Sequence, residues 1–244
     1  MNAYVEPEML PDFNSLNRAV EKILAEHGSG TYHIPPKYPD PVNRELFPTS
    51  QAGSAGAVAA KYLCPKKEIV LGLIGTGPRA ENQLEAISRE FSLSKVRVWD
   101  PDEKLAEAFC KKYCQFTIAV CNPKVTCDCD LLVTTTSSRT PIVRARWVRA
   151  GTHINAMGAD EPGKVELDPT LLALGKVFVV DRELSIQAGE INVPITRGFF
   201  SADRIAGTLG EVVLGKKGRT SDDEITIFDS AGCVAGPRVS PYEQ

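Results

Sequence analysis

Apolar residues near the N-terminus recur with the spacing of one helix face. Within residues 12–28, positions separated by three or four residues are apolar, namely Leu16, Ala19, Val20, Ile23 and Leu24. This spacing predicts an amphipathic helix, and Gly28 is its expected end. Residues 31–50 follow with five prolines and no sustained periodicity, which predicts a loop or linker. Residues 52–63 are rich in small side chains and are expected to form a helix packed closely against a neighbour.

From Glu68 onward the pattern changes to short apolar runs that alternate with helical segments. The runs predict seven strands, at 69–74, 95–100, 116–120, 130–136, 152–158, 176–181 and 224–230. Helices are expected over about 79–91 and from Pro101, a plausible first helical position. Apolar runs separated by helices are typical of a parallel sheet buried on both faces. The predicted fold class is therefore α/β, with a doubly wound Rossmann-type sheet.

Composition narrows the classes of protein to which the chain can belong. Of the 244 residues, 43% are hydrophobic and 24% are charged, and the net charge is −3. A balance this close to neutral, without a long basic run, argues against a nucleic-acid partner or an anionic membrane surface. The N-terminal segment lacks the basic and apolar regions of a signal peptide, and no apolar stretch is long enough to span a membrane. We expect a cytoplasmic protein.

The seven cysteines and three histidines do not predict a metal site. No Cys-x-x-Cys pair occurs, and the histidines are far apart in the sequence. His153 lies inside a predicted strand, where a packed histidine is more common than a metal ligand. Buried or incidental thiols are the simplest interpretation of the cysteines, with a redox role as the alternative.

The turn after the first predicted strand has the form G-x-G-x-x-A, a variant of the dinucleotide-binding fingerprint. Gly75 permits the tight turn, Gly77 lets the backbone approach a pyrophosphate, and Ala80 keeps the helix close to the strand. The helix N-terminus offers N–H groups and a positive dipole end to phosphates. The candidate cofactor-binding residues here are Gly75, Thr76, Gly77, Pro78, Arg79 and Ala80.

An acidic residue, Asp100, ends the next predicted strand, where a carboxylate can accept a hydrogen bond from a ribose 2′-hydroxyl and repel a 2′-phosphate. NAD is therefore favoured over NADP. Alternatively, Asp100 caps the helix that starts at Pro101. Polar clusters also end later strands and are positioned for the nicotinamide half, with Thr135, Thr136, Ser137, Met157, Gly158, Ala159 and Ser230 as candidates. Taken alone, the cluster of Thr135, Thr136 and Ser137 could reflect the β-propensity of threonine, and the cluster of Met157, Gly158 and Ala159 could reflect turn chemistry.

Several long segments resemble the ornithine cyclodeaminase/mu-crystallin family, and in particular its archaeal alanine dehydrogenase branch. They include SAGAVAAKYL (54–63), LGLIGTGPRAENQLEAI (71–87) and DLLVTTTSSRTPIV (130–143), then WVRAGTHINAMGADEPGKVELD (147–168) and the segment 189–232. The resemblance implies an NAD(P)-linked enzyme that moves a hydride between the nicotinamide and the α-carbon of a small amino or imino acid. It also implies a catalytic role in acid–base chemistry for Asp160 in GADEPGK. Lys164, from the same motif, is a candidate for both catalysis and substrate binding and would face the substrate carboxylate or a second polar group.

The chain also departs from this family. The antiparallel strands between the two N-terminal helices, with a lysine central to catalysis, have no counterpart here, and neither does the helix that follows S-x-G in the family. Lys37 aligns with a substrate-binding arginine of the family, and Gln51 stands where another would be. These departures predict a substrate and dimerisation remnant over 1–51, a nucleotide-binding domain over 52–232 and a tail over 233–244. They leave three hypotheses open: an NAD-dependent enzyme, for which the family implies a homodimer; a cofactor-binding protein without turnover; and an inactive truncated family member.

Overall fold

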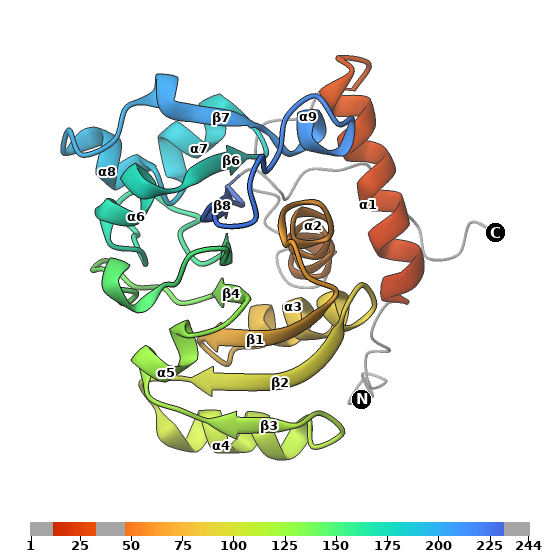
Figure 1. The fold of residues 1–244 in the computed structure, drawn as a ribbon, viewed down its shortest axis with the longest axis vertical. Coiled ribbons are helices and arrows are strands. Elements are labelled where there is room, and N and C mark those ends of the chain that lie inside the picture. The colour runs from red at the N-terminus through yellow and green to blue at the C-terminus, as the bar shows by residue number, and fades with distance from the viewer. Residues whose placement is uncertain (1–11, 33–46, 232–244) are drawn as a thin grey trace, which may run out of the picture.

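A parallel sheet of eight strands forms the centre of the computed structural model, which describes residues 12–32 and 47–231 (Figure 1). The strand order is β3-β2-β1-β4-β5-β8-β6-β7, and every pairing is parallel. The strands are β1 (Glu68–Ile74), β2 (Ser92–Trp99), β3 (Ile118–Val120), β4 (Leu131–Thr134), β5 (His153–Ala156), β6 (Lys176–Val179), β7 (Ile205–Thr208) and β8 (Thr226–Asp229). The chain builds outward from β1 in one direction and from β4 in the other, so the doubly wound α/β prediction is confirmed.

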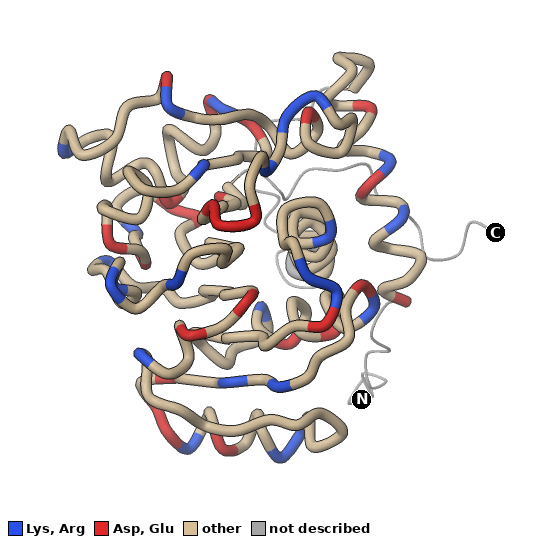
Figure 2. The backbone as a smooth tube through the Cα atoms, in the orientation of Figure 1, with Lys and Arg blue, Asp and Glu red and all other residues tan. Residues whose placement is uncertain are grey.

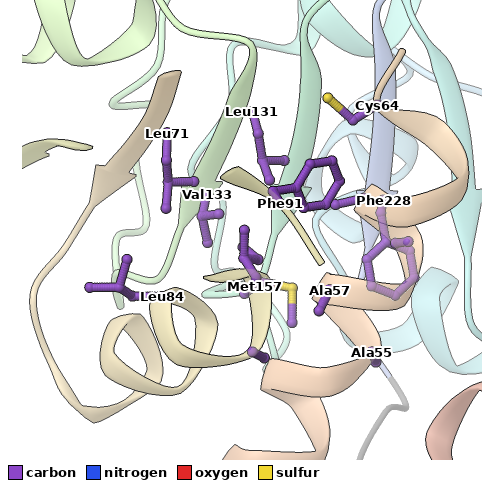
Figure 3. Packing of buried hydrophobic residues seen from close by; sticks show 14 of the residues in the cluster. Ala55, Ala57, Cys64, Leu71, Leu84, Phe91, Leu131, Val133, Met157 and Phe228 are labelled. Atoms are coloured by element: carbon purple, nitrogen blue, oxygen red, sulfur yellow. The ribbon is translucent and has the colours of Figure 1, made fainter. Parts of the chain in front are cut away.

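Helices cover both faces of this sheet. They are α1 (Phe13–Gly28), α2 (Phe47–Leu63), α3 (Pro78–Ser88), α4 (Glu103–Lys112), α5 (Pro123–Cys127), α6 (Pro169–Leu174), α7 (Arg182–Ala188), α8 (Asn192–Thr196) and α9 (Leu209–Val213), with 3-10 turns at Ala145–Trp147 and Ala202–Arg204. Leu131 and Val133 of β4 pack with Ala57 of α2 and Leu84 of α3 (Figure 3). Leu132 points to the opposite face. Alternate residues of one strand are thus buried in two different clusters, as a sheet covered on both faces requires.

Helix α1 lies outermost, against α2 and α9 (Figure 1). Asp12 caps it by accepting hydrogen bonds from the backbone N–H groups of Asn14 and Ser15. The helix ends at Gly28, as predicted, but the glycine also serves packing. A Cβ at Gly28 would overlap the backbone of Gly210, so α1 and α9 approach each other through two glycines.

Close packing of the small-residue helix is confirmed. A Cβ at Gly53 of α2 would lie 2.8 Å from the carbonyl oxygen of Asn82 in α3, and the Nε2 of Gln83 donates to the carbonyl of Ala52 over 2.9 Å. The start of this helix was predicted too late. It begins at Phe47 rather than at residue 52, so the end of the proline-rich segment is helical.

One strand and one further helix boundary differ from the sequence-based expectations. Strand β7 was not predicted, because its four residues are too few to give a clear pattern and include Gly207. Helix α4 begins at Glu103, not at Pro101, since Asp102 is the N-cap and accepts from the N–H of Lys104 over 3.0 Å. The division of the chain into domains at residue 52 stays a prediction.

Charges of both signs are interspersed along the described elements (Figure 2). Lys and Arg alternate with Asp and Glu on α1 and on α4, so neither helix carries a face of one sign. Within residues 12–32 and 47–231, no helix is long and apolar enough to cross a membrane.

Candidate functional site

The site is built where the strand order reverses, between β1 and β4. Strands β1, β4, β5 and β8 all point the same way, so their carboxyl ends lie at one edge of the sheet. The connections that leave β1 and β4 run to opposite sides, which leaves a crevice at this edge in doubly wound folds. The turns that follow these strands contain most of the predicted site residues.

The glycine turn after β1 has the geometry of a phosphate-binding turn. Gly75 has φ +97°, a conformation that favours glycine, and a Cβ there would lie 2.7 Å from Oγ1 of Thr135. Gly77 is the N-cap of α3, and a Cβ on it would meet nothing within 4 Å. Among the described residues no side chain caps this helix. Ala80 is fully buried beside the strand. The turn is therefore closed on its inner side and open over Gly77.

Asp100, which directly follows β2, contacts the glycine turn. Its Oδ2 accepts from the backbone N–H and the hydroxyl of Thr76, at 2.9 and 2.8 Å, and its Oδ1 accepts from the N–H of Asp102 at 2.9 Å. The alternative that Asp100 caps the following helix is wrong, because Asp102 takes that position. A carboxylate oxygen has more than one acceptor site, so these bonds leave Asp100 able to accept further donors.

An ion-pair cluster joins the turn after β1 to the turn after β5. The Nη2 of Arg79 lies 2.5 Å from Oδ2 of Asp160, and the Nζ of Lys164 lies 2.8 Å from Oδ1 of the same carboxylate. The Nη1 of Arg79 also donates to the carbonyl of Met157 over 3.3 Å. The side chain of Lys164 is 13% exposed and that of Asp160 24%. Two cations thus surround one carboxylate, and the Oε2 of Glu161, 3.5 Å from the Nζ of Lys164, adds a second carboxylate at the rim.

These cations determine the charge state of Asp160. Burial raises the pKa of its carboxyl, but hydrogen bonds and charge from Arg79 and Lys164 outweigh burial and lower the pKa to about 2. Asp160 is therefore an anion at neutral pH, and without a change in its surroundings it can accept a proton or pair with a cation but cannot donate a proton.

A second carboxylate at this edge, Glu166, was missed from the sequence. It is fully buried and accepts four hydrogen bonds. Oε1 accepts from the N–H (2.6 Å) and hydroxyl (2.7 Å) of Thr136, and Oε2 accepts from the hydroxyl of Thr134 (2.7 Å) and the N–H of Gly158 (2.9 Å). Burial raises the pKa of Glu166, and the four donors act against that rise. An acidic residue between apolar Val165 and Leu167 is the sequence signal that could have identified it.

Two more buried carboxylates support the same region. Glu190 accepts from the backbone N–H groups of Glu166 and Leu167, at 3.0 and 2.7 Å. Asp229, at the end of β8, accepts from the N–H groups of Ile191 and Ala231, at 3.2 and 3.1 Å. Burial raises the pKa of Glu190, as does the nearby charge of Glu166, and burial raises the pKa of Asp229 to about 6.

The remaining predicted site residues divide into three groups. Thr135 and Thr136 lie in the turn after β4, where Thr135 donates to the carbonyl of Ile74, and Ser137 is exposed beside them. Gly158 and Ala159 are buried in the turn after β5, and the N–H of Ser230 donates to Ala156 over 3.2 Å. The side chain of Met157 packs in the core against α2 and α3 (Figure 3), so only its backbone faces Arg79.

The predicted substrate-binding residues do not all come together. Lys164 lies in the ion-pair cluster, whereas Lys37 lies outside the described residues. Gln51 is half-buried on α2, and in the part of the chain that the structure describes no hydrogen bond joins it to Asp160, Lys164 or Arg79.

No metal centre is formed by the described residues, in which no three His, Cys, Asp or Glu side chains group to hold an ion. The described cysteines are free thiols, at positions 64, 110, 114, 121, 127 and 129. His153 is packed inside the fold, as expected. Its ring nitrogens lie 2.8 Å from Oγ1 of Thr226 and 3.0 Å from Oδ1 of Asn155, and burial lowers its pKa to about 3.

Known proteins share both the sequence and the fold. Alanine dehydrogenase from Archaeoglobus fulgidus is 46% identical over 200 residues, which is 80% of this chain and 62% of that protein. The solved structure of an archaeal alanine dehydrogenase dimer with bound NAD superposes with a TM-score of 0.84 at 36% identity, over 91% of this chain and 87% of that chain. Thermococcus litoralis Δ1-pyrroline-2-carboxylate reductase, solved with NADH and L-proline, gives a TM-score of 0.80 at 25% identity, over 92% and 91% of the two chains.

The aligned regions extend well beyond any single motif but do not cover the whole length of the relatives. Aligned regions span 57–62% of the length of the first curated relatives that the chain matches. The family model of the ornithine cyclodeaminases and mu-crystallins matches residues 42–235, which include every described element from α2 to β8. The chain therefore belongs to the ornithine cyclodeaminase/mu-crystallin family.

Proposed function

We propose that the chain is an NAD-dependent oxidoreductase that acts at the α-carbon of a small L-amino or imino acid. The observation that carries this proposal is the Arg79–Asp160–Lys164 cluster, which lies beside a dinucleotide-type glycine turn at the carboxyl edge of the sheet. A cluster that holds two cations beside an ionised carboxylate is complementary to an amino acid, which carries a carboxylate and an ammonium group.

The residues at this edge fit NAD. Open space over Gly77 and the α3 N-terminus without a side-chain cap would receive the pyrophosphate. Asp100 would accept from the adenosine ribose, and its charge would disfavour a 2′-phosphate. The turns after β4, β5 and β8 would border the nicotinamide, through Thr135, Thr136, Ser137, Gly158, Ala159 and Ser230. The relatives solved with NAD and NADH support this assignment.

Bound NAD supplies the hydride acceptor, and the side chains of the chain manage charge and protons around the substrate. We assign to Lys164 the substrate carboxylate, because its largely buried ammonium group is paired with Asp160 and a substrate carboxylate can take the place of that partner. Asp160 would hold the substrate ammonium group and accept a proton from it as the α-carbon is oxidised. A carboxylate with a pKa near 2 is a weak base. Because Arg79 and Lys164 are what lower the pKa of Asp160, a ligand that draws either cation away makes Asp160 a stronger base.

Cofactor binding without turnover is the second candidate function. It is favoured by Gln51, which as an amide lacks the charged fork with which an arginine binds a carboxylate. Both candidates require NAD binding, and only the first requires hydride transfer.

A titration followed by an activity assay separates the two. We would titrate the protein with NADH and NADPH by fluorescence, then monitor NADH absorbance with L-alanine and NAD, and with pyruvate, ammonium and NADH. With L-ornithine and NAD we would measure proline and ammonium, because cyclodeamination returns the hydride and leaves NADH absorbance unchanged. Saturable NADH binding with a change in NADH, or with proline formation from ornithine, supports the oxidoreductase. Binding without turnover supports the second candidate, and no binding overturns both.

The assembly and cellular location are part of the same proposal. A homodimer is proposed by likeness to the archaeal alanine dehydrogenase dimer, and its mass in solution can be measured by light scattering. We also propose a cytoplasmic location, where NAD and amino acids are available, which fractionation of expressing cells can test.

A further inference from the structure

We propose that Glu166 is a positioning residue that holds the turns after β4 and β5 at the spacing needed to receive the nicotinamide ring. This inference rests on the proposed function, and it concerns a residue with no direct contact to cofactor or substrate. It follows from how one buried side chain connects two turns that are separate in sequence.

The hydrogen bonds of Glu166 divide evenly between its two oxygens. Each oxygen accepts one hydroxyl and one backbone N–H, and the two N–H groups belong to different turns, Thr136 after β4 and Gly158 after β5. A backbone N–H can only donate, so both oxygens must act as acceptors. Since Glu166 is completely buried, no water can replace it if either bond is lost.

Steric fit points to the same role. A Cβ at Gly158 would overlap both the carbonyl oxygen of Thr136 and the Glu166 carboxylate, so the two turns are in direct contact around this side chain. Glu190 in turn accepts from the N–H groups of Glu166 and Leu167 and fixes the backbone from which Glu166 projects. The turns after β4 and β5 are therefore joined by buried polar contacts, whereas the partly exposed ion pairs join the turns after β1 and β5.

The Glu166→Gln variant tests the assignment. Glutamine keeps the shape of the side chain, but its amide nitrogen cannot accept, so one of the two backbone N–H groups loses its partner. One turn should then shift while the glycine turn after β1 stays in place. Affinity for NADH should fall about tenfold, whereas affinity for ADP-ribose, which lacks the nicotinamide, should stay within about twofold of wild type.

His153→Gln is the matched control. His153 is also fully buried and also loses side-chain hydrogen bonds on substitution, but it lies at the opposite end of β5. It should lower thermal stability and leave the ratio of NADH to ADP-ribose affinity unchanged. If Glu166→Gln behaves as this control does, Glu166 is only structural and the assignment is overturned.

Two further outcomes keep the tests distinct. If the wild-type protein binds neither probe, the proposed function fails and this assignment fails with it. If it binds NADH and ADP-ribose equally well, cofactor binding stands, but the turns do not receive the nicotinamide and the assignment is overturned.

Should Glu166→Gln not fold, Thr134→Val removes one hydroxyl donor from Oε2 and should shift the ratio of NADH to ADP-ribose affinity in the same direction by roughly twofold to fivefold. An unchanged ratio in that variant would also overturn the assignment.

Discussion

Asp160 and Glu166 are six positions apart in the sequence, yet the protein holds their carboxylates in opposite ways. Asp160 is partly exposed and is paired with two cations, Arg79 and Lys164. Glu166 is fully buried, and its hydrogen-bond donors among the described residues are hydroxyls and backbone N–H groups. The cations lower the pKa of Asp160 to about 2, whereas burial raises the pKa of Glu166.

This difference separates a group that can change partners from one that cannot. Ion pairs that water and incoming ligands can reach, as at the partly exposed Asp160, contribute less to stability because both compete for the same charges. The cluster around Asp160 can therefore exchange its internal partners for the carboxylate and ammonium of a substrate. Buried hydrogen bonds have no such competitor, and breaking one leaves an unpaired donor at a substantial cost. Glu166 accordingly suits a fixed support.

The largest effect should come from removing the charge of Asp160. In the Asp160→Asn variant, turnover on any amino acid that the wild type oxidises should fall at least about 100-fold, the loss typical of a missing acid–base group. NADH affinity should change little, because the backbone of the glycine turn stays in place and the introduced asparagine can still accept a hydrogen bond from Arg79. Steady-state kinetics and the NADH titration check both statements.

Glu161→Gln is the matched control for that loss. Glu161 is exposed and its Oε2 lies 3.5 Å from the Nζ of Lys164, so it is the neighbouring carboxylate without a central position in the cluster. Its variant should keep near wild-type turnover. Equal losses in both variants would mean that the general charge of the loop matters and not Asp160 itself.

Two glycine variants test the same difference between a fixed support and an open site, through the free energy of unfolding. Gly158→Ala places a Cβ against Glu166 and Thr136 and should destabilise the fold by about 1–3 kcal/mol in urea unfolding. Gly77→Ala places its Cβ in open space and should change stability by about 0.5 kcal/mol or less. The second variant should nevertheless weaken NADH binding. The contrast is broken if Gly77→Ala is the more destabilising of the two.

The sequence alone predicted the parts of the molecule that depend on local pattern. Apolar runs such as 69–74 identified the buried strands, and the spacing of Gly75, Gly77 and Ala80 identified the turn between β1 and α3. The four residues of β7 escaped detection because they are too few to establish a period. The resemblance to a family, and not the pattern, pointed to Asp160 and Lys164.

Contacts between distant turns were beyond this kind of reasoning. Nothing local indicates that Arg79 reaches across to Asp160, since the pair is brought together only by the order of β1, β4 and β5 in the sheet. Glu166 was missed for a related reason. A glutamate is normally exposed, and its burial becomes intelligible only when Thr134, Thr136 and Gly158 are seen around it.

A pH series tests the charge states themselves. The folded pKa of Asp160, about 2, lies below its ordinary value of 3.8, so its contribution to stability is present above pH 3.8 and is lost as the pH falls through 2. The effect of pH on Asp229 has the opposite sign. Its folded pKa of about 6 lies above its ordinary value of 3.8, so its contribution to stability is present below pH 3.8 and is lost as the pH rises through 6. Urea unfolding of Asp160→Asn should therefore lack only the acid-side loss, at most about 2 kcal/mol and less after solvent screening. A variant that keeps the whole wild-type profile would show that the ion pairs do not form in solution.

The surroundings of Asp100 are intermediate between those of Asp160 and Glu166, and the Asp100 variant should give the smallest effect. It is half-buried, and its donors Thr76 and Asp102 come from its own turn and the one beside it, with no cation. Asp100→Asn removes the charge that disfavours a 2′-phosphate, so the preference for NADH over NADPH should shrink by about tenfold. Asp102→Asn is the matched control, because it removes an equal charge next to the turn while remaining an acceptable cap for α4. Parallel titrations with both cofactors measure the ratio, and a similar shift in the two variants would attribute the preference to the overall field of the turn and not to a contact made by Asp100.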